Sequence, residues 1–137
     1  YEEELQIVQN TTGNADPMPV SGFSAAEIIA YQKAIRSLPV SEHVLQYAVK
    51  LARKSRPDDP STTAEVKKWV SWGAGPRASQ YLILAAKTRA ALAGRLTPAE
   101  EDVRAVAQIV LGHRILVSFA AEAEGISSRD IIRKLLE

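Results

Sequence analysis

The stretch from Gly73 to Arg77 carries the clearest chemical signal in this sequence. Pro76 suits the first position of a helix, because its missing N–H is not needed there, and Gly75 then suits the N-cap position. Arg77 falls in the first turn, beside free backbone N–H groups and the positive end of the helix dipole, where a cation is unfavourable by about 0.3–1 kcal/mol. Helix N-termini bind phosphate readily. One interpretation is therefore that an anion belongs beside Arg77, and the other is an exposed arginine that points into water.

Several other site chemistries find no support in the sequence. Gly73-Ala74-Gly75 lacks the third glycine and the preceding strand of a dinucleotide fingerprint, and no phosphate loop of the form G-x-x-x-x-G-K-[ST] is present. His43 and His113 have no second ligand three or four residues away, which argues against a zinc site. No nucleophile elbow supports a serine–histidine–aspartate triad.

Two tryptophans, Trp69 and Trp72, flank the glycine-rich stretch. Their indole rings could stack on an adenine. Their helical spacing with Val66 and Val70 favours a different interpretation, in which they pack in the core or anchor the loop, because indoles bury large areas.

Cations at two further places allow a functional and a plain interpretation. His113-Arg114 follows a regular helical pattern and could hook a ligand or a neighbouring domain, but cations at a helix C-terminus are favoured by the dipole alone. Lys87, Arg89 and Arg95 could form a basic strip, but acidic residues at 100–102 make an ordinary solvated face the simpler interpretation.

Composition limits the class of protein. The 137 residues suit one compact domain with a core. Seventeen Lys and Arg oppose sixteen Asp and Glu, and the net charge of +1 argues against duplex DNA or an acidic membrane as a partner. The absence of cysteine excludes disulfides and fits a reducing compartment, so we expect a cytoplasmic protein. Apolar runs such as 81–86 are too short to span a bilayer.

The elements that must position Arg77 are helical. Leu5, Ile7 and Val8 suggest a short helix that ends before Asp16-Pro17. A capping box at Ser24 and Glu27 predicts a helix that Pro39 stops. Ser41 caps the next predicted helix, whose apolar face comprises Val44, Leu45, Ala48, Leu51 and Ala52. A second capping box at residues 62–65 begins a helix that must end near Gly73.

The second half of the chain repeats this pattern. From Pro76 a longer helix is predicted to run to Gly94, with Leu82, Ala85, Ala86 and Leu92 facing inward and the glycine in the C′ position. Thr97 and Glu100 predict a capping box for a helix that begins at Pro98. Its apolar residues are Val103, Val106, Ala107, Val110 and Leu111. A last helix begins at Ser127 or Ser128, and we expect it to bury Ile131, Ile132, Leu135 and Leu136.

The predicted fold class is all-α, a compact bundle of about six or seven helices joined by short loops. The one strand-like run, residues 115–117, is too short to build a sheet. The chain begins with Tyr1 and three glutamates, which favours a piece of a longer protein.

Four segments together resemble one known family. The segment 72–79, Trp-Gly-Ala-Gly-Pro-Arg-Ala-Ser, is similar to the second-sensor segment of MoxR-type AAA+ ATPases, and residues 85–90, 97–103 and 110–115 resemble the same family in order and spacing. The resemblance extends over nearly the whole chain. One departure is Gly75, where the family often has serine, which weakens the expected cap and leaves the arginine in place.

The resemblance implies that residues 1–137 are the helical lid that closes over ATP bound by an upstream core domain. Arg77 would then be the second-sensor arginine, catalytic and nucleotide-binding in the full-length ATPase, which favours the phosphate interpretation given above. ATP and Mg²⁺ would belong to the parent protein, with no cofactor expected in this fragment alone. Ring assembly, a chaperone-like role and partners with von Willebrand A domains are implied in the same way. The family's phosphate loop, magnesium-binding acids, first sensor and arginine finger have no match in these residues.

An alternative from another class is a self-contained helical module that binds proteins or DNA. Its best support is the C-terminal segment with Arg129, Arg133 and Lys134. Its weakness is the near-zero net charge.

Overall fold

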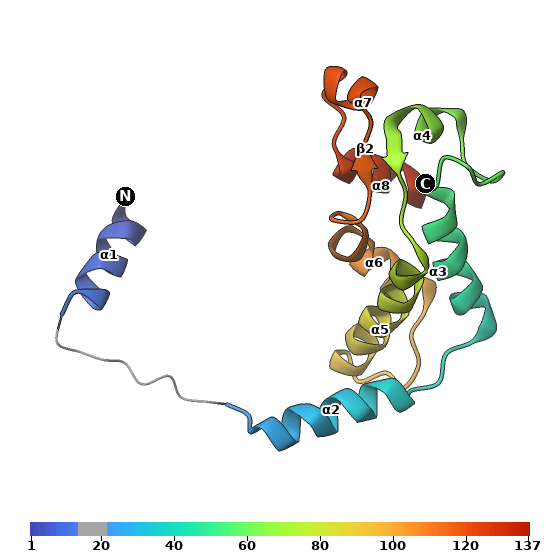
Figure 1. Cartoon of the computed structure of the whole chain (residues 1–137). Coiled ribbons are helices and arrows are strands. Elements are labelled where there is room, and N and C mark those ends of the chain that lie inside the picture. Colours follow the sequence, from blue (N-terminus) through green and yellow to red (C-terminus); the bar gives the residue numbers. More distant parts are fainter. Residues whose placement is uncertain (14–21) are drawn as a thin grey trace. The chain divides into compact units, whose positions relative to one another are not determined.

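The computed structural model describes residues 1–13 and 22–137 (Figure 1). Within them the chain forms eight helices and two short strands. In order these are α1 (Glu2–Thr11), α2 (Ala25–Ser37), α3 (Glu42–Lys54), α4 (Ala64–Trp69), β1 (Val70–Trp72), α5 (Pro76–Leu92), α6 (Glu100–Leu111), β2 (Leu116–Val117), α7 (Phe119–Ala123) and α8 (Ser128–Leu136). The all-α prediction is confirmed, with one helix more than expected, because α7 is only five residues long and carries no periodic pattern.

The chain divides into two compact units, residues Tyr1–Tyr31 and Gln32–Glu137. In the first, α1 is the short helix that the sequence predicted, and none of its side chains is buried. The capping box of α2 is confirmed: the Glu27 carboxylate accepts from the Ser24 N–H at 2.7 Å, and the Ser24 hydroxyl accepts from the Glu27 N–H at 3.2 Å. The predicted turn at Asp16-Pro17 lies outside the described residues.

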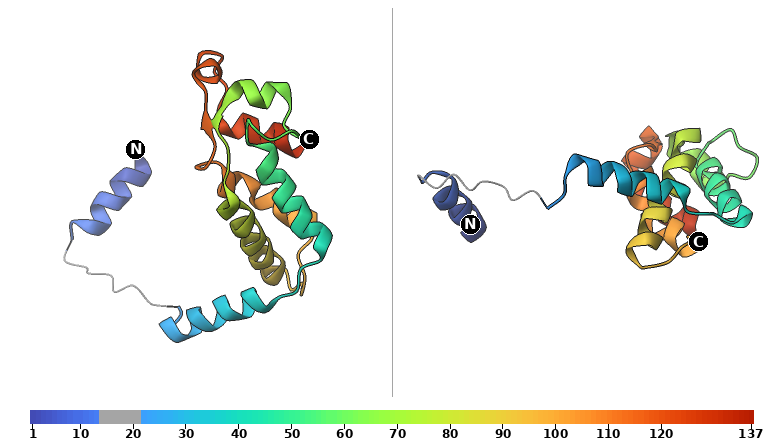
Figure 2. Two further views of the ribbon diagram at one scale, coloured as in Figure 1. Left: turned by 45° about the vertical axis from the view of Figure 1, so that its right-hand side comes forward. Right: turned by 90° about the horizontal axis from the view of Figure 1, so that it is seen from below.

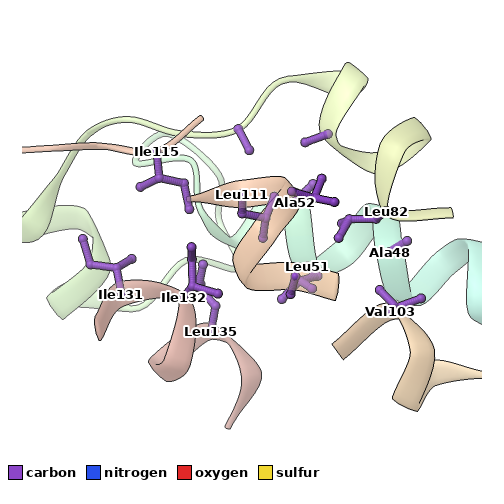
Figure 3. Packing of buried hydrophobic residues seen from close by; sticks show 14 of the residues in the cluster. Ala48, Leu51, Ala52, Leu82, Val103, Leu111, Ile115, Ile131, Ile132 and Leu135 are labelled. Carbon is purple, nitrogen blue, oxygen red and sulfur yellow. The ribbon is translucent and has the colours of Figure 1, made fainter. Parts of the chain in front are cut away.

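The second unit contains the core. Helices α3, α5 and α6 pack against one another, and α8 packs on α3 and α6 (Figures 1 and 2). Figure 3 shows side chains from these helices, among them Leu51, Leu111 and Ile132, pointing into one interior. Most of the predicted core residues are buried, because the periodic apolar faces of these helices meet one another. Leu45 and Leu92 are exposed, Leu92 in the last turn of α5 with 86% of its surface accessible. Three more, Ala85, Val106 and Leu136, are half-buried at the edge of the core.

Two predicted boundaries were wrong. Helix α4 ends at Trp69, and Val70–Trp72 leaves it as a strand that pairs antiparallel with β2, Val70 opposite Val117. Of the strand-like run 115–117, Leu116 and Val117 therefore do contribute to a sheet, a two-stranded one (Figure 1). Helix α6 begins at Glu100 with Ala99 as N-cap, two residues later than expected, because the Asp102 carboxylate accepts from the Ala99 N–H at 2.9 Å.

Helix α5 ends as predicted. Gly94 occupies C′ with φ of 70°, the left-handed region that glycine enters without steric cost. The Arg95 N–H bonds to the Ala90 carbonyl at 2.8 Å and the Gly94 N–H to the Ala91 carbonyl at 2.9 Å, the pair of bonds of a Schellman motif. The chain therefore reverses sharply between α5 and α6.

Candidate functional site

The start of α5 has the geometry that the sequence predicts. Gly75 is the N-cap in extended conformation, Pro76 is the first helical residue, and no acidic residue lies in the first turn. Arg77 is exposed, and among the described residues it makes no hydrogen bond or ion pair within the chain. A cation without a protein partner therefore lies at the positive end of a 17-residue helix.

The loop before α5 is bonded to the two residues that follow α3. The hydroxyl of Ser55, which is fully buried, accepts from the Ala74 N–H at 2.9 Å and donates to the Ala52 carbonyl at 2.7 Å. The Nε of Arg56 donates to the Ala74 carbonyl at 2.8 Å. Both backbone groups of Ala74 are thus satisfied by residues that follow α3, which fixes the position from which α5 begins.

Gly73 lets the two segments approach closely. A Cβ atom at this position would lie 2.4 Å from the Ser55 carbonyl oxygen and 2.6 Å from the Arg56 Cα, distances that no side chain tolerates. Sequence reasoning identified the glycines and missed Ser55 and Arg56. Their only sequence signal is their position at the end of α3, which gives no indication of a partner 18 or 19 residues away.

A groove of about 360 Å³ opens beside this loop. Its walls include Arg56, Asp58, Trp72 and the loop residues 73–76. Trp72 is 71% exposed, so the prediction that it packs in the core or anchors the loop was wrong. Trp69 does pack against the core, and its Nε1 donates to a Glu124 carboxylate oxygen at 3.0 Å.

Glu124 joins the elements at this end of the unit. Its carboxylate also accepts from the Lys68 ammonium at 2.5 Å, and α4 packs on α7 there. The bond from Lys68, and to a smaller extent the bond from Trp69, holds the pKa of Glu124 below its usual range. Lys68 lies 56 positions and Trp69 55 positions before Glu124 in the sequence, so these two bonds connect distant parts of the chain. They fix the end of α4, from which β1 leads to the loop.

Lys87, Arg89 and Arg95 do not form a free basic strip, the less favoured of the two interpretations given above. Arg95 makes a bidentate ion pair with Asp102 at 2.6 Å for each bond, and Arg89 reaches the same carboxylate at 3.1 Å. Asp102 is fully buried, and the bonds from Arg95 outweigh its burial, so that its pKa lies below the usual range. Lys87 donates to the Arg36 carbonyl at 2.8 Å. These cations fix α5 to its neighbours. From the sequence, Asp102 was placed among acidic residues of a solvated face, and its burial was not predicted.

The remaining candidates have structural partners or lie apart. Arg114 donates to the Val110 carbonyl at 3.0 Å and lies 5.1 Å from the Tyr81 ring centre, so it closes the end of α6. His43 and His113 are exposed, and no group of metal-binding side chains occurs in residues 1–13 and 22–137. In α8, Lys134 pairs with Glu65 at 2.8 Å and Arg133 with Asp130 at 3.5 Å, which weakens the DNA-binding alternative.

No helix in the described part of the chain is long and apolar enough to cross a membrane.

Comparison with known proteins agrees with this geometry. Residues 62–135 match the AAA lid domain family. Chaperone MoxR1 of Mycobacterium tuberculosis is 30% identical over 136 residues, 99% of this chain and 36% of that protein. The uncharacterised protein YeaC of Bacillus subtilis is 27% identical over 80% of this chain and 32% of its own length. The chain therefore spans about a third of the length of these curated relatives.

A crystal structure supports the same assignment. A Cytophaga hutchinsonii protein provisionally described as an ATPase superimposes with a TM-score of 0.83 at 29% identity, over 98% of this chain and 41% of that one. With the match over residues 62–135 and the MoxR1 likeness along the chain, this chain belongs to the AAA lid domain family and is similar to MoxR-type AAA+ proteins.

Proposed function

We propose that this lid closes over ATP held by an upstream core domain, and that Arg77 is the second-sensor arginine that meets the terminal phosphates. The observation that carries the proposal is the exposed Arg77 at the start of α5, with no protein partner among the described residues. Nucleotide phosphates would supply the charge that this cation lacks.

The chemistry of phosphoryl transfer explains why such an arginine is useful. The reaction depends on positioning and on stabilising the charge that spreads over the phosphoryl oxygens. An arginine on a separate domain makes that stabilisation depend on closure of the lid. When the terminal phosphate leaves, Arg77 loses its partner and the lid loosens, which is the logic of a hinge between two states.

The surroundings of Arg77 suit a phosphate and do not suit a metal ion. The first turn of α5 has no acidic residue, and the backbone N–H groups there face no capping side chain. Mg²⁺ prefers oxygen ligands, usually carboxylates and phosphates. The lid would therefore contact the ATP, and the carboxylates that hold Mg²⁺ would belong to the core domain.

The descriptions of two relatives support a proposal for the parent protein. One relative is described as a chaperone, and the Cytophaga protein is described provisionally as an ATPase. We propose that the parent of this lid hydrolyses ATP as a cytoplasmic ring of identical subunits and remodels other proteins in a chaperone-like way. Partners with von Willebrand A domains are part of the same proposal.

Substitution of Arg77 in the parent ATPase tests the proposal. Arg77→Ala should slow ATP turnover about 10–10³-fold, equivalent to about 1.4–4 kcal/mol, and should weaken ATP binding less than turnover. Arg77→Lys should restore activity only in part, because an ammonium cannot reproduce the planar fork of a guanidinium. Turnover, ATP affinity and melting temperature are measured for each variant.

Arg129 offers a matched control. It is exposed, and it is the second residue of α8 as Arg77 is of α5. It does not line the groove beside the loop that precedes α5. Arg129→Ala should leave turnover unchanged. Wild-type turnover in a folded Arg77→Ala parent would remove Arg77 from the nucleotide site.

A further inference from the structure

Trp72 is a large aromatic side chain that the fold leaves free. It is 71% exposed, and no hydrogen bond, aromatic pair or cation–π contact involves it among the described residues. Trp69, three residues earlier, has both a hydrogen-bond partner and core contacts. The backbone of Trp72 is nevertheless fixed, because it pairs with Leu116 in the two-stranded sheet. The indole is thus held in place without a partner of its own.

The groove beside Trp72 has little net charge. Of its lining side chains, Arg56 and Asp58 are charged, and they are of opposite sign. A triphosphate carries several negative charges and would meet Asp58 unfavourably. A flat neutral group with polar edges fits better, because the Asp58 carboxylate can accept from an amine and the terminal guanidinium nitrogens of Arg56 can donate.

The groove ends at the residue that precedes Arg77 in the chain. Pro76 lines it and is directly followed by Arg77, and β1 leads through the loop into α5 (Figure 1). A ligand whose anionic groups contact Arg77 and whose uncharged aromatic group contacts Trp72 would match both sites. A nucleotide has this distribution of charge.

We propose that Trp72 is a stacking platform for the base of the nucleotide whose phosphates meet Arg77. The inference rests on the proposed function and adds a residue that positions the nucleotide. Stacking of a base on an aromatic side chain is worth about 1–3 kcal/mol and depends little on which base is present. The platform therefore contributes affinity and orientation more than choice among bases.

The platform needs little ordering when a base arrives. Ser55 and Arg56 bond both backbone groups of Ala74, and Gly73 is in contact with the backbone of residues 55 and 56. A site that is already rigid loses less conformational entropy on binding. The aromatic face and the phosphate-binding arginine are consequently held on one stiff segment.

The test compares ATP with inorganic triphosphate, which lacks the base, as ligands of the full parent ATPase. Trp72→Ala should raise the dissociation constant for ATP about 5–150-fold, the equivalent of about 1–3 kcal/mol, and leave that for triphosphate unchanged. Trp72→Phe should retain most of the ATP affinity. Phe119→Ala is the matched control, because Phe119 is 85% exposed and does not line the groove.

Fluorescence gives a second readout that survives a folding defect in the alanine variant. ATP should quench the part of the tryptophan emission that is absent in Trp72→Phe, and triphosphate should not. The inference is overturned if Trp72→Ala leaves ATP affinity unchanged, if both ligands weaken together, or if Phe119→Ala has the same effect. The last result would show that the loss of ATP affinity does not come from stacking in this groove.

The two proposals fail in different ways. If Arg77→Ala slows turnover while Trp72→Ala leaves ATP affinity intact, the second-sensor role stands and the stacking platform does not. If turnover is unchanged in Arg77→Ala, the proposed function fails. A loss of affinity in Trp72→Ala that is specific to ATP would then show that Trp72 binds the base although Arg77 does not contact the phosphates.

Discussion

At the residue scale, Arg77 depends on side chains that it does not touch. Its helix begins where Ser55 and Arg56 hold the backbone of Ala74, and that contact exists because Gly73 has no side chain. The position of Arg77 therefore depends on the buried hydroxyl of Ser55 and on the absence of a side chain at Gly73.

We expect Gly73→Ala to destabilise the lid. The added Cβ would overlap backbone atoms of residues 55 and 56, and backbone cannot yield as the end of a flexible side chain can. The free energy of unfolding should fall by about 1–3 kcal/mol, in the range of other overpacking substitutions. Urea denaturation of both proteins measures this difference.

Gly75→Ala is the control for this prediction. No atom lies within 4 Å of a Cβ built on Gly75, and its φ of −80° suits any residue. Because alanine is a poorer N-cap than glycine, the stability of this variant should fall, but by no more than about 1 kcal/mol and by less than that of Gly73→Ala. Equal losses in the two variants would show that close packing at Gly73 is not what matters.

The sequence could predict the site only in part at this scale. Gly75, Pro76 and Arg77 follow local rules for helix starts, so their positions were predictable. Ser55 was not, because its importance comes from a contact with Ala74 that only the folded chain creates. The exposure of Trp72 was missed for a related reason, since helical spacing was assumed where the chain becomes a strand.

At the element scale, a buried carboxylate fastens the turn between α5 and α6. Asp102 accepts from the Ala99 N–H and from two arginines, Arg89 and Arg95, whose side chains are about half exposed. The same carboxylate thus caps one helix and ties it to the end of another.

Asp102→Asn should lower the free energy of unfolding by about 1.5–3 kcal/mol at neutral pH, the usual worth of hydrogen bonds to a charged group. The pKa of Asp102 is lowered in the folded protein, chiefly by Arg95. Its contribution is therefore complete above the unfolded pKa of about 3.9 and is lost as the pH falls through the lower folded value. Urea titrations between about pH 7 and pH 2 follow this change.

The difference between the wild type and Asp102→Asn should accordingly shrink on acidification. Asp130→Asn is a useful comparison, because Asp130 also has a lowered pKa and caps α8, but it lies on the surface. Its loss at neutral pH should be smaller than that of Asp102→Asn. A difference for Asp102→Asn that is constant over the whole pH range would show that its charge does not stabilise the fold.

Sequence periodicity predicted the long helices well and the short elements poorly. Helices α3, α5, α6 and α8 each present an apolar face long enough to detect, and these faces form the core. The strands β1 and β2 have three and two residues, and they exist because they pair with each other, Val70 with Val117 and Trp72 with Leu116, from distant parts of the sequence. No local pattern reports such pairing.

At the scale of the whole molecule, stability resides in one of the two units. Among residues 1–13 and 22–137, every buried apolar residue belongs to the second unit, and α1 buries none of its side chains. We expect the chain to give a helical circular dichroism spectrum and a cooperative melt. Removal of residues 1–13 should change the free energy of unfolding by less than about 0.5 kcal/mol.

A coil spectrum at room temperature would contradict this expectation and would show that the lid needs its core domain to fold. A large loss of stability on removing residues 1–13 would show that α1 contributes to the fold of the isolated chain.

The isolated chain should neither hydrolyse ATP nor bind it tightly. It offers one arginine and one aromatic platform, and most of the groups that clamp a triphosphate are not in it. We expect a dissociation constant of about 1 mM or weaker, equivalent to about 4 kcal/mol or less. Calorimetric titration measures it, and micromolar affinity would mean that these residues contain a complete nucleotide site.

Helix α5 connects the proposed phosphate contact at Arg77 to the opposite end of the lid. Its 17 residues extend about 25 Å at 1.5 Å per residue. The loop before it is bonded to Ser55, which follows α3, and Arg89 in its last turn is bonded to Asp102 of α6. Because both ends are fixed, the helix would move together with the helices packed on it. If the proposed function is right and the lid turned by about 10° about the loop, the far end of α5 would move through about 4 Å, so the part of the lid farthest from Arg77 would move most when the phosphate leaves.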